Sequence, residues 1–457
     1  MTRLLPLAAA IVLGNVLLAL TWAPHLSTSG DNAEYINLSQ HLGDYASTKF
    51  PPLYPAVLWL VGPDLTAMKL VAGASYVALG AVVTAYAGIL AGVLTLTMPA
   101  LLLMSSQVMA DVPFALLVTV GVLLCASRER RPSRSWIAYS GDPPGFGPAV
   151  YQTAQAWWWT GFAILLLSCY VKTAGVAIVL GVLLLQGRKL RPWAVATLVL
   201  APWFAWTWYH GGNTYIGKSL LANGYYPERG FVAPIALLER VWSNVNTYIY
   251  HMPMILALFI VGERRLLLLP FIPYMGLTLI WPWAADRMLV PLVPICAIAL
   301  SLGVKDAVSK PWARHTFYAA FIALAVLALG RVVLAHQALP DELSPEWQRY
   351  RDAGVWLRDN TPKESIVCAR KPGWLGWHAQ RKGVGFLFVG RDSLWQDLLD
   401  KRVDYVVVDQ LGYAATPRHL IPALQAHGDE LRLRWSSGGT HILEMWHDGT
   451  QAEDSPR

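Results

Sequence analysis

Apolar stretches of helical length alternate with short polar segments over the first three quarters of the chain. A helix needs roughly 20 apolar residues to span the hydrocarbon layer of a membrane. The pattern therefore predicts about eleven transmembrane helices, some of them short or joined by tight turns. The expected segments are 4–22, 66–89, 91–108, 112–127, 156–170, 173–187, 193–209, 246–262, 266–283, 288–304 and 315–335.

The composition agrees with an α-helical multi-pass membrane protein. Hydrophobic residues make up 55% of the 457 residues and charged residues only 14%, whereas a typical soluble protein is about 25% charged. The 21 Trp and 19 Tyr residues suit the membrane–water boundary, where both are enriched. We interpret the first apolar segment as a retained helix, since no small-residue cleavage site follows it and many further apolar segments do.

Lys and Arg gather in alternate loops, and this indicates the orientation in the membrane. Loops 128–134, 187–191, 262–265 and 305–314 are basic, as cytoplasmic loops usually are. We therefore expect a cytoplasmic N-terminus in the plasma membrane, the inner membrane of a bacterium. The formal charge of +7 then reports orientation and not a nucleic-acid partner. The expected outer segments are 23–65, 210–245 and the turns near residues 111, 172 and 286.

The chain changes character near residue 338, beyond which no stretch is long and apolar enough to cross a membrane. We predict two domains, a membrane domain over 1–337, which includes the outer loop 23–65, and a small α/β domain over 338–457. An odd number of spans places the second domain outside the cytoplasm. Its expected elements are helices over 344–360 and 391–402, strands over 365–370, 384–389 and 404–410, and a terminal hairpin over 430–446 that turns at Gly438–Gly439.

Isolated charges next to apolar segments are the candidates for chemistry. Asp31, Asp111, Lys172 and Arg287 each stand between or beside apolar runs and share the predicted outer face. Such charges are costly near a membrane unless they are paired or line a polar cavity, so a functional role is the default hypothesis. The alternative for each one is a helix cap or an anchor that extends to the membrane surface.

The first outer loop also holds a pair of carboxylates. Asp31 and Glu34 are three residues apart, which places both on one side of a helical turn. Oxygen ligands of this kind could hold a divalent cation, or one carboxylate could act as a general base while the other orients the acceptor. The sequence leaves both possibilities open and requires no cofactor.

Two other patterns carry less weight. "GNTYIGKS" at 212–219 fits the spacing of a phosphate-binding loop, but the buried strand and the Mg²⁺-binding acid that this motif requires are missing. The four cysteines show neither disulfide nor metal-ligand spacing.

The order of the motifs resembles a known superfamily. "GDNAEY" follows the first span, "KFPPLYP" comes next, "MADVPF" stands at the second outer turn and "DRMLVPLVP" at a late one. This series, with a terminal soluble domain, resembles the GT-C superfamily of membrane glycosyltransferases, and is similar to the bacterial relatives of protein O-mannosyltransferase and of the lipid A aminoarabinose transferase. The resemblance implies transfer of a hexosyl or pentosyl group from a polyprenyl-phosphate carrier to a glycan, lipid or protein acceptor on the outer side.

The resemblance also implies roles for individual residues. Asp31 matches the catalytic acidic residue of the first loop, and Asp111 matches the acid of the second outer loop. Lys49, Lys172 and Arg287 become candidates for binding the carrier phosphate. This chain has "DNAE" where the mannosyltransferases have adjacent Asp and Glu, so Glu34 departs from the pattern of the catalytic pair.

Elementary chemistry is consistent with these roles. Phosphate is a good leaving group, so the reaction needs a base for the acceptor hydroxyl and cations for the departing phosphate more than it needs an acid. Two other classes stay open. A secondary transporter would place charges near mid-membrane in repeated, broken helices, whereas these charges fall at helix ends. A non-catalytic scaffold would tolerate loss of Asp31 and Asp111.

Overall fold

The computed structural model describes residues 4–23, 25–28, 30–45, 47–127, 148–187, 189–210, 219–222, 229–251, 265–282, 286–307, 310–337 and 343–446. The chain divides into two compact units, Met1–His25 with Asp44–His336 and Leu26–Gly43 with Gln337–Arg457. Part of the first predicted outer loop therefore groups with the C-terminal region. The predicted division into two domains, with a boundary after residue 337, stays a prediction.

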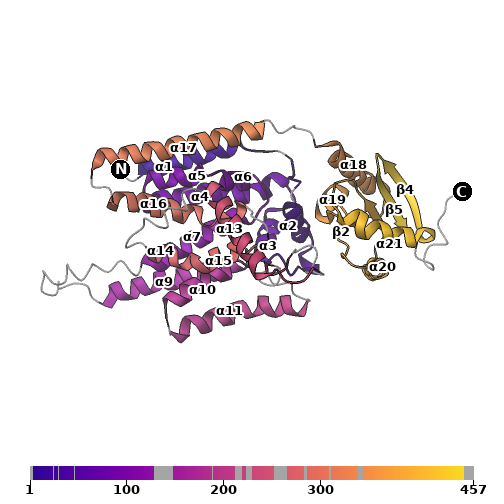
Figure 1. Ribbon diagram of the computed structural model, residues 1–457, viewed down its shortest axis with the longest axis horizontal. Coiled ribbons are helices and arrows are strands. Elements are labelled where there is room, and N and C mark those ends of the chain that lie inside the picture. The colour runs from indigo at the N-terminus through magenta and orange to yellow at the C-terminus, as the bar shows by residue number, and fades with distance from the viewer. Residues whose placement is uncertain are drawn as a thin grey trace. The chain divides into compact units, whose positions relative to one another are not determined.

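The first unit is helical, and its long helices run in approximately one direction, with α17 and α11 along opposite edges (Figure 1). Its helices are α1 Leu4–Leu20, α3 Leu53–Val61, α4 Leu65–Ala87, α5 Ile89–Leu96, α6 Pro99–Ser105, α7 Asp111–Ser127, α9 Pro148–Cys169, α10 Gly175–Leu185, α11 Leu190–Tyr209, α13 Pro234–His251, α14 Arg265–Leu268, α15 Ile272–Leu279, α16 Val293–Ala307 and α17 Pro311–Gln337.

Several predicted spans are broken into shorter helices. The segment 91–108 contains the end of α5 and all of α6, because Pro99 has no N–H to continue the first helix and instead occupies the first turn of the next. The segment 266–283 is divided in the same way into α14, the 3₁₀ turn Leu269–Phe271 and α15, with prolines at both restarts. Residues 252–262 of another span lie outside the described residues.

The predicted number of spans is not confirmed. Within the described ranges, α4 alone is both long and apolar enough to cross a membrane by itself, and five further apolar helices are shorter. These five have between 10 and 17 residues each, too few to cross the hydrocarbon layer alone.

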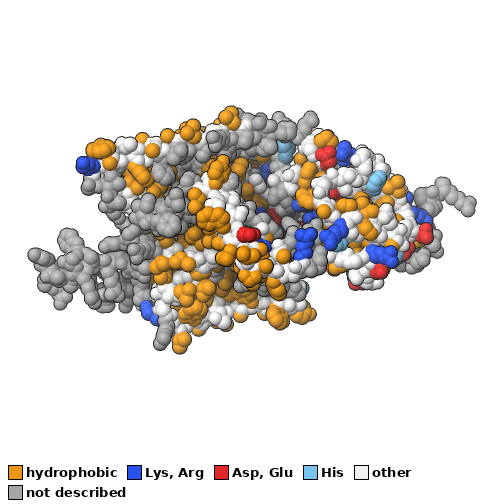
Figure 2. Space-filling view, in the orientation of Figure 1, with side chains coloured by type: hydrophobic (Ala, Val, Ile, Leu, Met, Phe, Trp, Pro, Cys, Tyr) orange, Lys and Arg blue, Asp and Glu red, His pale blue; other side chains and the backbone are white. Residues whose placement is uncertain are grey.

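The surface of the first unit fits a lipid environment. Trp208, Leu190 and Leu198 on α11 are 87%, 81% and 76% exposed, and Trp242 on α13 is 67% exposed. Soluble monomers rarely expose apolar patches larger than a few hundred Å². On the visible face hydrophobic side chains outnumber charged ones among the coloured parts of this unit, and more of the charged side chains lie on the second (Figure 2). The first unit therefore has the surface of a membrane-embedded helical bundle.

The second unit is built on a five-stranded mixed sheet in the order β2-β1-β3-β5-β4. β1 is parallel to β2 and β3, and β5 is antiparallel to β3 and β4. The elements are β1 Ile366–Ala369, β2 Lys382–Val384, β3 Tyr405–Val408, β4 Leu431–Ser437 and β5 Thr440–Met445, with helices α2 Gly30–Gln40, α18 Pro345–Asn360, α19 Pro372–Ala379, α20 Arg391–Asp400 and α21 Ile421–Ala426.

Most predicted elements of this unit are confirmed, and one strand is wrong. The hairpin turns at Gly438 and Gly439, whose φ angles of 50° and 84° suit a two-residue hairpin turn. The strand predicted over 384–389 ends at Val384, because β2 is an edge strand and its partner β1 offers only four residues. Phe386 is buried in the core and Phe388 packs against it from outside the sheet.

Helix α2 packs against α19 within the second unit. A Cβ atom on Gly373 would lie 2.7 Å from the carbonyl oxygen of Ala33 and 2.9 Å from the amide nitrogen of Glu34. Only a glycine lets two backbones approach so closely. The helix that carries the predicted carboxylate pair is therefore seated directly on the first turn of α19.

Candidate active site

Asp111 and Lys172 form a buried ion pair in the first unit. The Lys172 ammonium donates a hydrogen bond of 2.6 Å to Asp111 Oδ1, and the residues are 7% and 2% exposed. Asp111 is the first residue of α7, where the helix dipole favours a negative charge. Lys172 lies in the turn between α9 and α10, so the pair joins two of the predicted outer turns.

Small residues set the distance between the helices that carry this pair. A Cβ atom on Gly161 of α9 would lie 2.7 Å from the carbonyl oxygen of Gly121 on α7. Small residues permit this kind of close helix contact in membrane bundles. Because α7 begins at the end where α9 finishes, close packing brings Asp111 and Lys172 together.

The aromatic and proline motif of the first loop reaches the same place. The amide of Leu53, the first residue of α3, donates a hydrogen bond of 3.0 Å to the carbonyl of Tyr170. The next residue, Tyr54, is 1% exposed and close enough to Asp111 to interact with it electrostatically. The motif "KFPPLYP" thus belongs with the second and third outer turns, as its place in the predicted series suggested.

Arg287 lies on the 3₁₀ turn Asp286–Leu289. Contacts of Tyr274 link this turn to the first turn of α7. The hydroxyl of Tyr274 donates a hydrogen bond of 2.8 Å to the carbonyl of Met288. The ring of Tyr274 lies 6.4 Å from that of Phe114, which follows Asp111 on α7. Arg287 itself is partly buried. Four segments that are far apart in sequence therefore converge on one end of the helices.

Lys49 precedes this cluster and is exposed, with its ammonium 4.4 Å from the centre of the Phe50 ring. The phenol of Tyr45 donates to the carbonyl of Phe50 and holds the loop at this point. Lys49 is therefore a solvent-accessible cation at the entrance to α3.

Asp31 and Glu34 lie on α2, one turn apart and both partly buried, as their spacing predicted. They belong to the second unit, whereas the other predicted site residues belong to the first. Among the residues that the structure describes, no group of three or more His, Cys, Asp or Glu side chains could hold a metal ion. A metal site would rest on the two carboxylates of α2 alone, and it stays a prediction.

Two cations near the outer segments escaped the sequence analysis. Lys69 on α4 is 2% exposed, and its ammonium donates to the carbonyls of Ala23 and His25, the latter at 2.6 Å. Arg240 on α13 donates to the carbonyls of Ser219 and Leu221 at 2.7 and 3.0 Å. Both residues lie in stretches whose helical pattern suggests packing, so nothing in the sequence marks them as different from other residues of those helices. Lys69 secures the segment that follows α1, and Arg240 secures residues 219–221 against α13.

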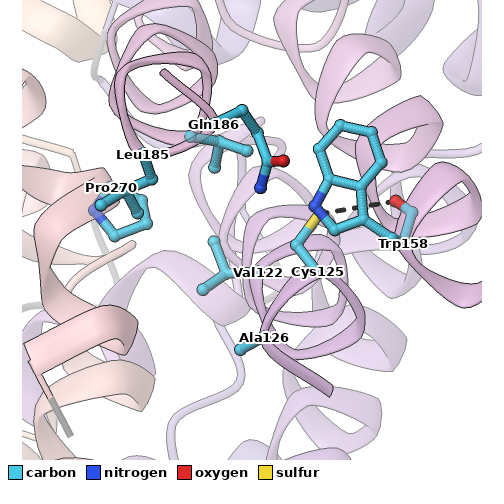
Figure 3. A pocket seen from close by; sticks show the side chains of 8 residues that line it. Val122, Cys125, Ala126, Trp158, Leu185, Gln186 and Pro270 are labelled. Atoms are coloured by element: carbon cyan, nitrogen blue, oxygen red, sulfur yellow. Dashed lines mark hydrogen bonds between the residues drawn. The ribbon is translucent and has the colours of Figure 1, made fainter. Parts of the chain in front are cut away.

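Two hollows in the first unit differ in their relation to the ion pair. One is lined by Val122, Cys125, Trp158, Gln186 and Pro270, and the Cys125 thiol donates to the Trp158 carbonyl at 3.6 Å (Figure 3). Cys125 is 14 residues after Asp111 on α7, which is about 21 Å along the helix axis. This hollow is therefore at the opposite end of α7 from the candidate site.

The other hollow is an apolar groove between α9 and α11. Trp159, Phe162 and Leu166 line one side and Val195 and Val199 the other. The groove ends at Tyr170, two residues before Lys172, and the phenol of Tyr170 donates a 2.5 Å hydrogen bond to the Val199 carbonyl. The groove thus offers an apolar surface along α9, and its lining includes neither Asp111 nor Lys172.

Comparison with known proteins identifies the fold. No family model and no curated protein sequence matches the chain, whereas solved structures match over almost its full length. The chain has the fold of the GT-C glycosyltransferases, as the order of its motifs predicted.

Two solved structures illustrate the likeness. ArnT from Cupriavidus metallidurans, crystallised with undecaprenyl phosphate, superposes with a TM-score of 0.57 at 14% identity, over 96% of this chain and 97% of that one. The Archaeoglobus fulgidus oligosaccharyltransferase, in complex with zinc and sulfate, gives 0.56 at 12% identity over 96% and 73%. At such identities the likeness establishes the fold, and the activity needs its own argument.

Proposed function

We propose that the protein is a glycosyltransferase that moves a sugar from a polyprenyl-phosphate carrier to an acceptor on the extracytoplasmic side of the membrane. The observation that carries this proposal is the convergence of α3, Asp111, Lys172 and the Arg287 turn at one end of a GT-C-like helical unit. Structural relatives were solved with undecaprenyl phosphate and with a tethered acceptor peptide, which supports this class of donor and the presence of an acceptor.

Asp31 is the proposed general base. It removes the proton from the acceptor hydroxyl as that oxygen attacks the anomeric carbon, and the carrier phosphate leaves with the electrons of the broken bond. Glu34, one helical turn along, orients the acceptor or shares a divalent cation with Asp31. A base of this kind contributes roughly 10²–10⁴-fold to the rate.

Cations balance the charge on the departing phosphate. Arg287 and the accessible Lys49 are the proposed direct contacts. Lys172 spends one of its three donors on Asp111, which leaves two for a phosphate oxygen. In this proposal Asp111 fixes the position of Lys172 and keeps the ammonium charged in a buried setting.

A lipid-linked donor also explains the apolar groove between α9 and α11. From Trp159 to Tyr170 the groove follows α9 for 11 residues, or about 16 Å. Its apolar lining suits the isoprenoid tail, while the phosphate at the end of the tail would reach Lys172.

The test is a lipid analysis in cells that lack the protein. The unused polyprenyl-phosphate sugar is expected to accumulate, and mass spectrometry of the extracted lipids identifies the sugar. The native chain should restore normal levels, whereas Asp31→Asn should lower transfer by at least about a hundredfold with normal membrane insertion. Asp44→Asn, in the same loop, is the matched control. Full complementation by Asp31→Asn, or solute uptake without any transfer, would exclude the proposal.

A further inference from the structure

The strand order of the second unit contains a topological switch point of the kind at which α/β proteins bind ligands. β1 continues through α19 to β2 on one side of it, and β2 continues through α20 to β3 on the other side. The chain therefore changes direction between β1 and β3, and ligands bind outside the carboxyl ends of strands at such a switch point. Arg370 and Lys371 directly follow β1, and Asp409 directly follows β3.

Aromatic rings hold the two cations in place. The Arg370 guanidinium carbon lies 5.2 Å from the centre of the Phe388 ring and 4.7 Å from that of Tyr413. The Lys371 ammonium lies 4.6 Å from the same Tyr413 ring. Such cation–π contacts are attractive even at exposed sites, and they orient the cations without using their N–H groups.

Those N–H groups have no acceptor within the described part of the unit. Neither the Arg370 guanidinium nor the Lys371 ammonium donates a hydrogen bond there, and Arg370 Nε is buried. The nearby Asp409 carboxylate is already occupied by the Leu411 amide at 3.0 Å and the Thr416 hydroxyl at 3.1 Å. A buried donor without a partner carries an unfavourable desolvation cost, and this cost calls for an explanation.

Arg381 in the same unit shows what a structural arginine looks like. Its guanidinium donates five hydrogen bonds, to the Thr361 hydroxyl and to the carbonyls of Arg358, Thr361, Ala379 and Gln380. Arg370 is instead held by two aromatic rings and keeps its donors available. If Arg370 only braced the loops after β2 and β3, its buried N–H would remain an uncompensated cost.

His419 adds an acceptor at the same place. Its ring stacks on Phe388 with 5.7 Å between centroids, and Nδ1 lies 3.1 Å from the carbonyl of Val389. A carbonyl only accepts, so the proton of the neutral ring is on Nδ1. Nε2 is then an acceptor, and it is buried without a partner among the described residues.

We propose that Arg370, Lys371 and His419, with the rings of Phe388 and Tyr413, bind an anionic saccharide. Its phosphate or carboxylate accepts from the Arg370 fork and the Lys371 ammonium. One of its hydroxyl groups donates to His419 Nε2. The rings provide the flat apolar surface on which a sugar can stack.

The position of the site suggests which saccharide it binds. Lys371 immediately precedes α19, and Gly373 on that helix touches the backbone of α2 at Ala33 and Glu34. A saccharide held here is next to the helix of the proposed base, so we assign it to the acceptor. This assignment rests on the proposed function, whereas the binding of the saccharide does not.

The test measures binding by the full-length protein in detergent micelles, with no lipid donor present. Isothermal titration calorimetry compares glucose 1-phosphate with methyl glucoside and with inorganic phosphate. Glucose 1-phosphate is expected to bind at least tenfold more tightly than either. Arg370→Gln should weaken its binding at least tenfold and Tyr413→Leu severalfold, while Arg391→Gln, which alters an exposed ion pair of the same unit, should leave it unchanged.

Unaltered binding by Arg370→Gln would overturn the proposal, and equal affinity for inorganic phosphate would overturn its saccharide part. If Arg370→Gln does not fold, Lys371→Gln provides the same test, with a severalfold loss expected and no loss as the contrary result. Binding without any sugar transfer would support this site and count against the proposed function, so the two can fail separately.

Discussion

The Lys172–Asp111 ion pair of the first unit and the Arg434–Glu444 ion pair of the second differ in their burial. In the first, Lys172 and Asp111 are buried and joined at 2.6 Å, and Lys69 is buried against two carbonyls. In the second, the comparable pair Arg434–Glu444 keeps side-chain exposures of 44% and 21%. Loss of one partner therefore has different consequences for stability in the two pairs. A charge buried away from water depends on its partner far more than an exposed charge does.

Arg370 belongs to neither pattern. It is partly buried, yet its guanidinium is held by rings rather than by acceptors. The comparison shows that burial and pairing are separate properties of a charge. A charge whose donors are all occupied, such as Arg381, fixes the architecture, whereas an oriented charge with available donors can bind a ligand.

The largest effect is expected at the buried pair. Asp111→Asn or Lys172→Met alone should lower the free energy of unfolding by about 3–5 kcal/mol, because each leaves a buried charge without its partner. Unfolding of the purified protein in detergent measures this, with Lys310→Gln on the exposed surface as control. The double variant Asp111→Asn/Lys172→Met should lose much less than the sum. Additive losses would show that the two residues are not coupled.

The partly buried imidazole of His378 tests how a titratable group of the second unit responds to loss of water. Burial, together with the nearby Arg351 and Arg358, lowers the pKa of His378 from 6.5 to about 4. The neutral ring is therefore favoured in the folded state, and stability should fall as the pH drops from about 6.5 towards 4, by at most about 3 kcal/mol. Denaturation at several pH values measures the slope, and His378→Gln should flatten it. An unchanged slope in that variant would assign the effect to other groups.

The contact between α2 and α19 should be the next most sensitive. Gly373→Ala places a methyl group within 2.7 Å of the Ala33 carbonyl oxygen, and such overpacking typically costs about 1–3 kcal/mol. If α2 carries the base, sugar transfer should fall along with thermal stability. Gly390→Ala is the matched control, since no atom lies within 4 Å of the added carbon. Full activity in Gly373→Ala would separate α2 from the reaction.

The smallest effect is expected at the exposed pair. Arg434→Gln removes the contact with Glu444, and exposed ion pairs contribute about 0–1 kcal/mol. The unfolding midpoint should shift little, and less still in high salt, where surface charges are screened. A loss similar to that of Lys172→Met would contradict the contrast between the two units.

Much of the helical unit could be predicted because its hydrophobic pattern is strong. The predicted segments coincide with α1, α4, α7, α10 and α11 within a few residues, and the isolated charges Asp111 and Lys172 were already on one predicted face. Their direct pairing could not be predicted, since it depends on the close contact at Gly121 and Gly161. Residue spacing carries no information about such approaches between distant segments.

The second unit shows where local patterns fail. The alternation of 384–389 is typical of a strand, but a strand also requires a neighbour, and β1 ends too early. Helix α19 was not predicted, because "PGWLGWHA" has two glycines and no clear helical period. The grouping of α2 with this unit depends on a contact between residues 33 and 373, and only the folded chain reveals it.

That contact has a consequence for the timing of synthesis. The residues of α2 leave the ribosome early, but the helix against which they pack is more than three hundred positions later. At about 5–20 residues per second, the interval is on the order of tens of seconds. Until α19 has been made, the helix that carries the carboxylates proposed for catalysis has no partner to pack against. A chain released before residue 373 would insert its helices and still lack a positioned base, so activity would begin only with an essentially complete protein.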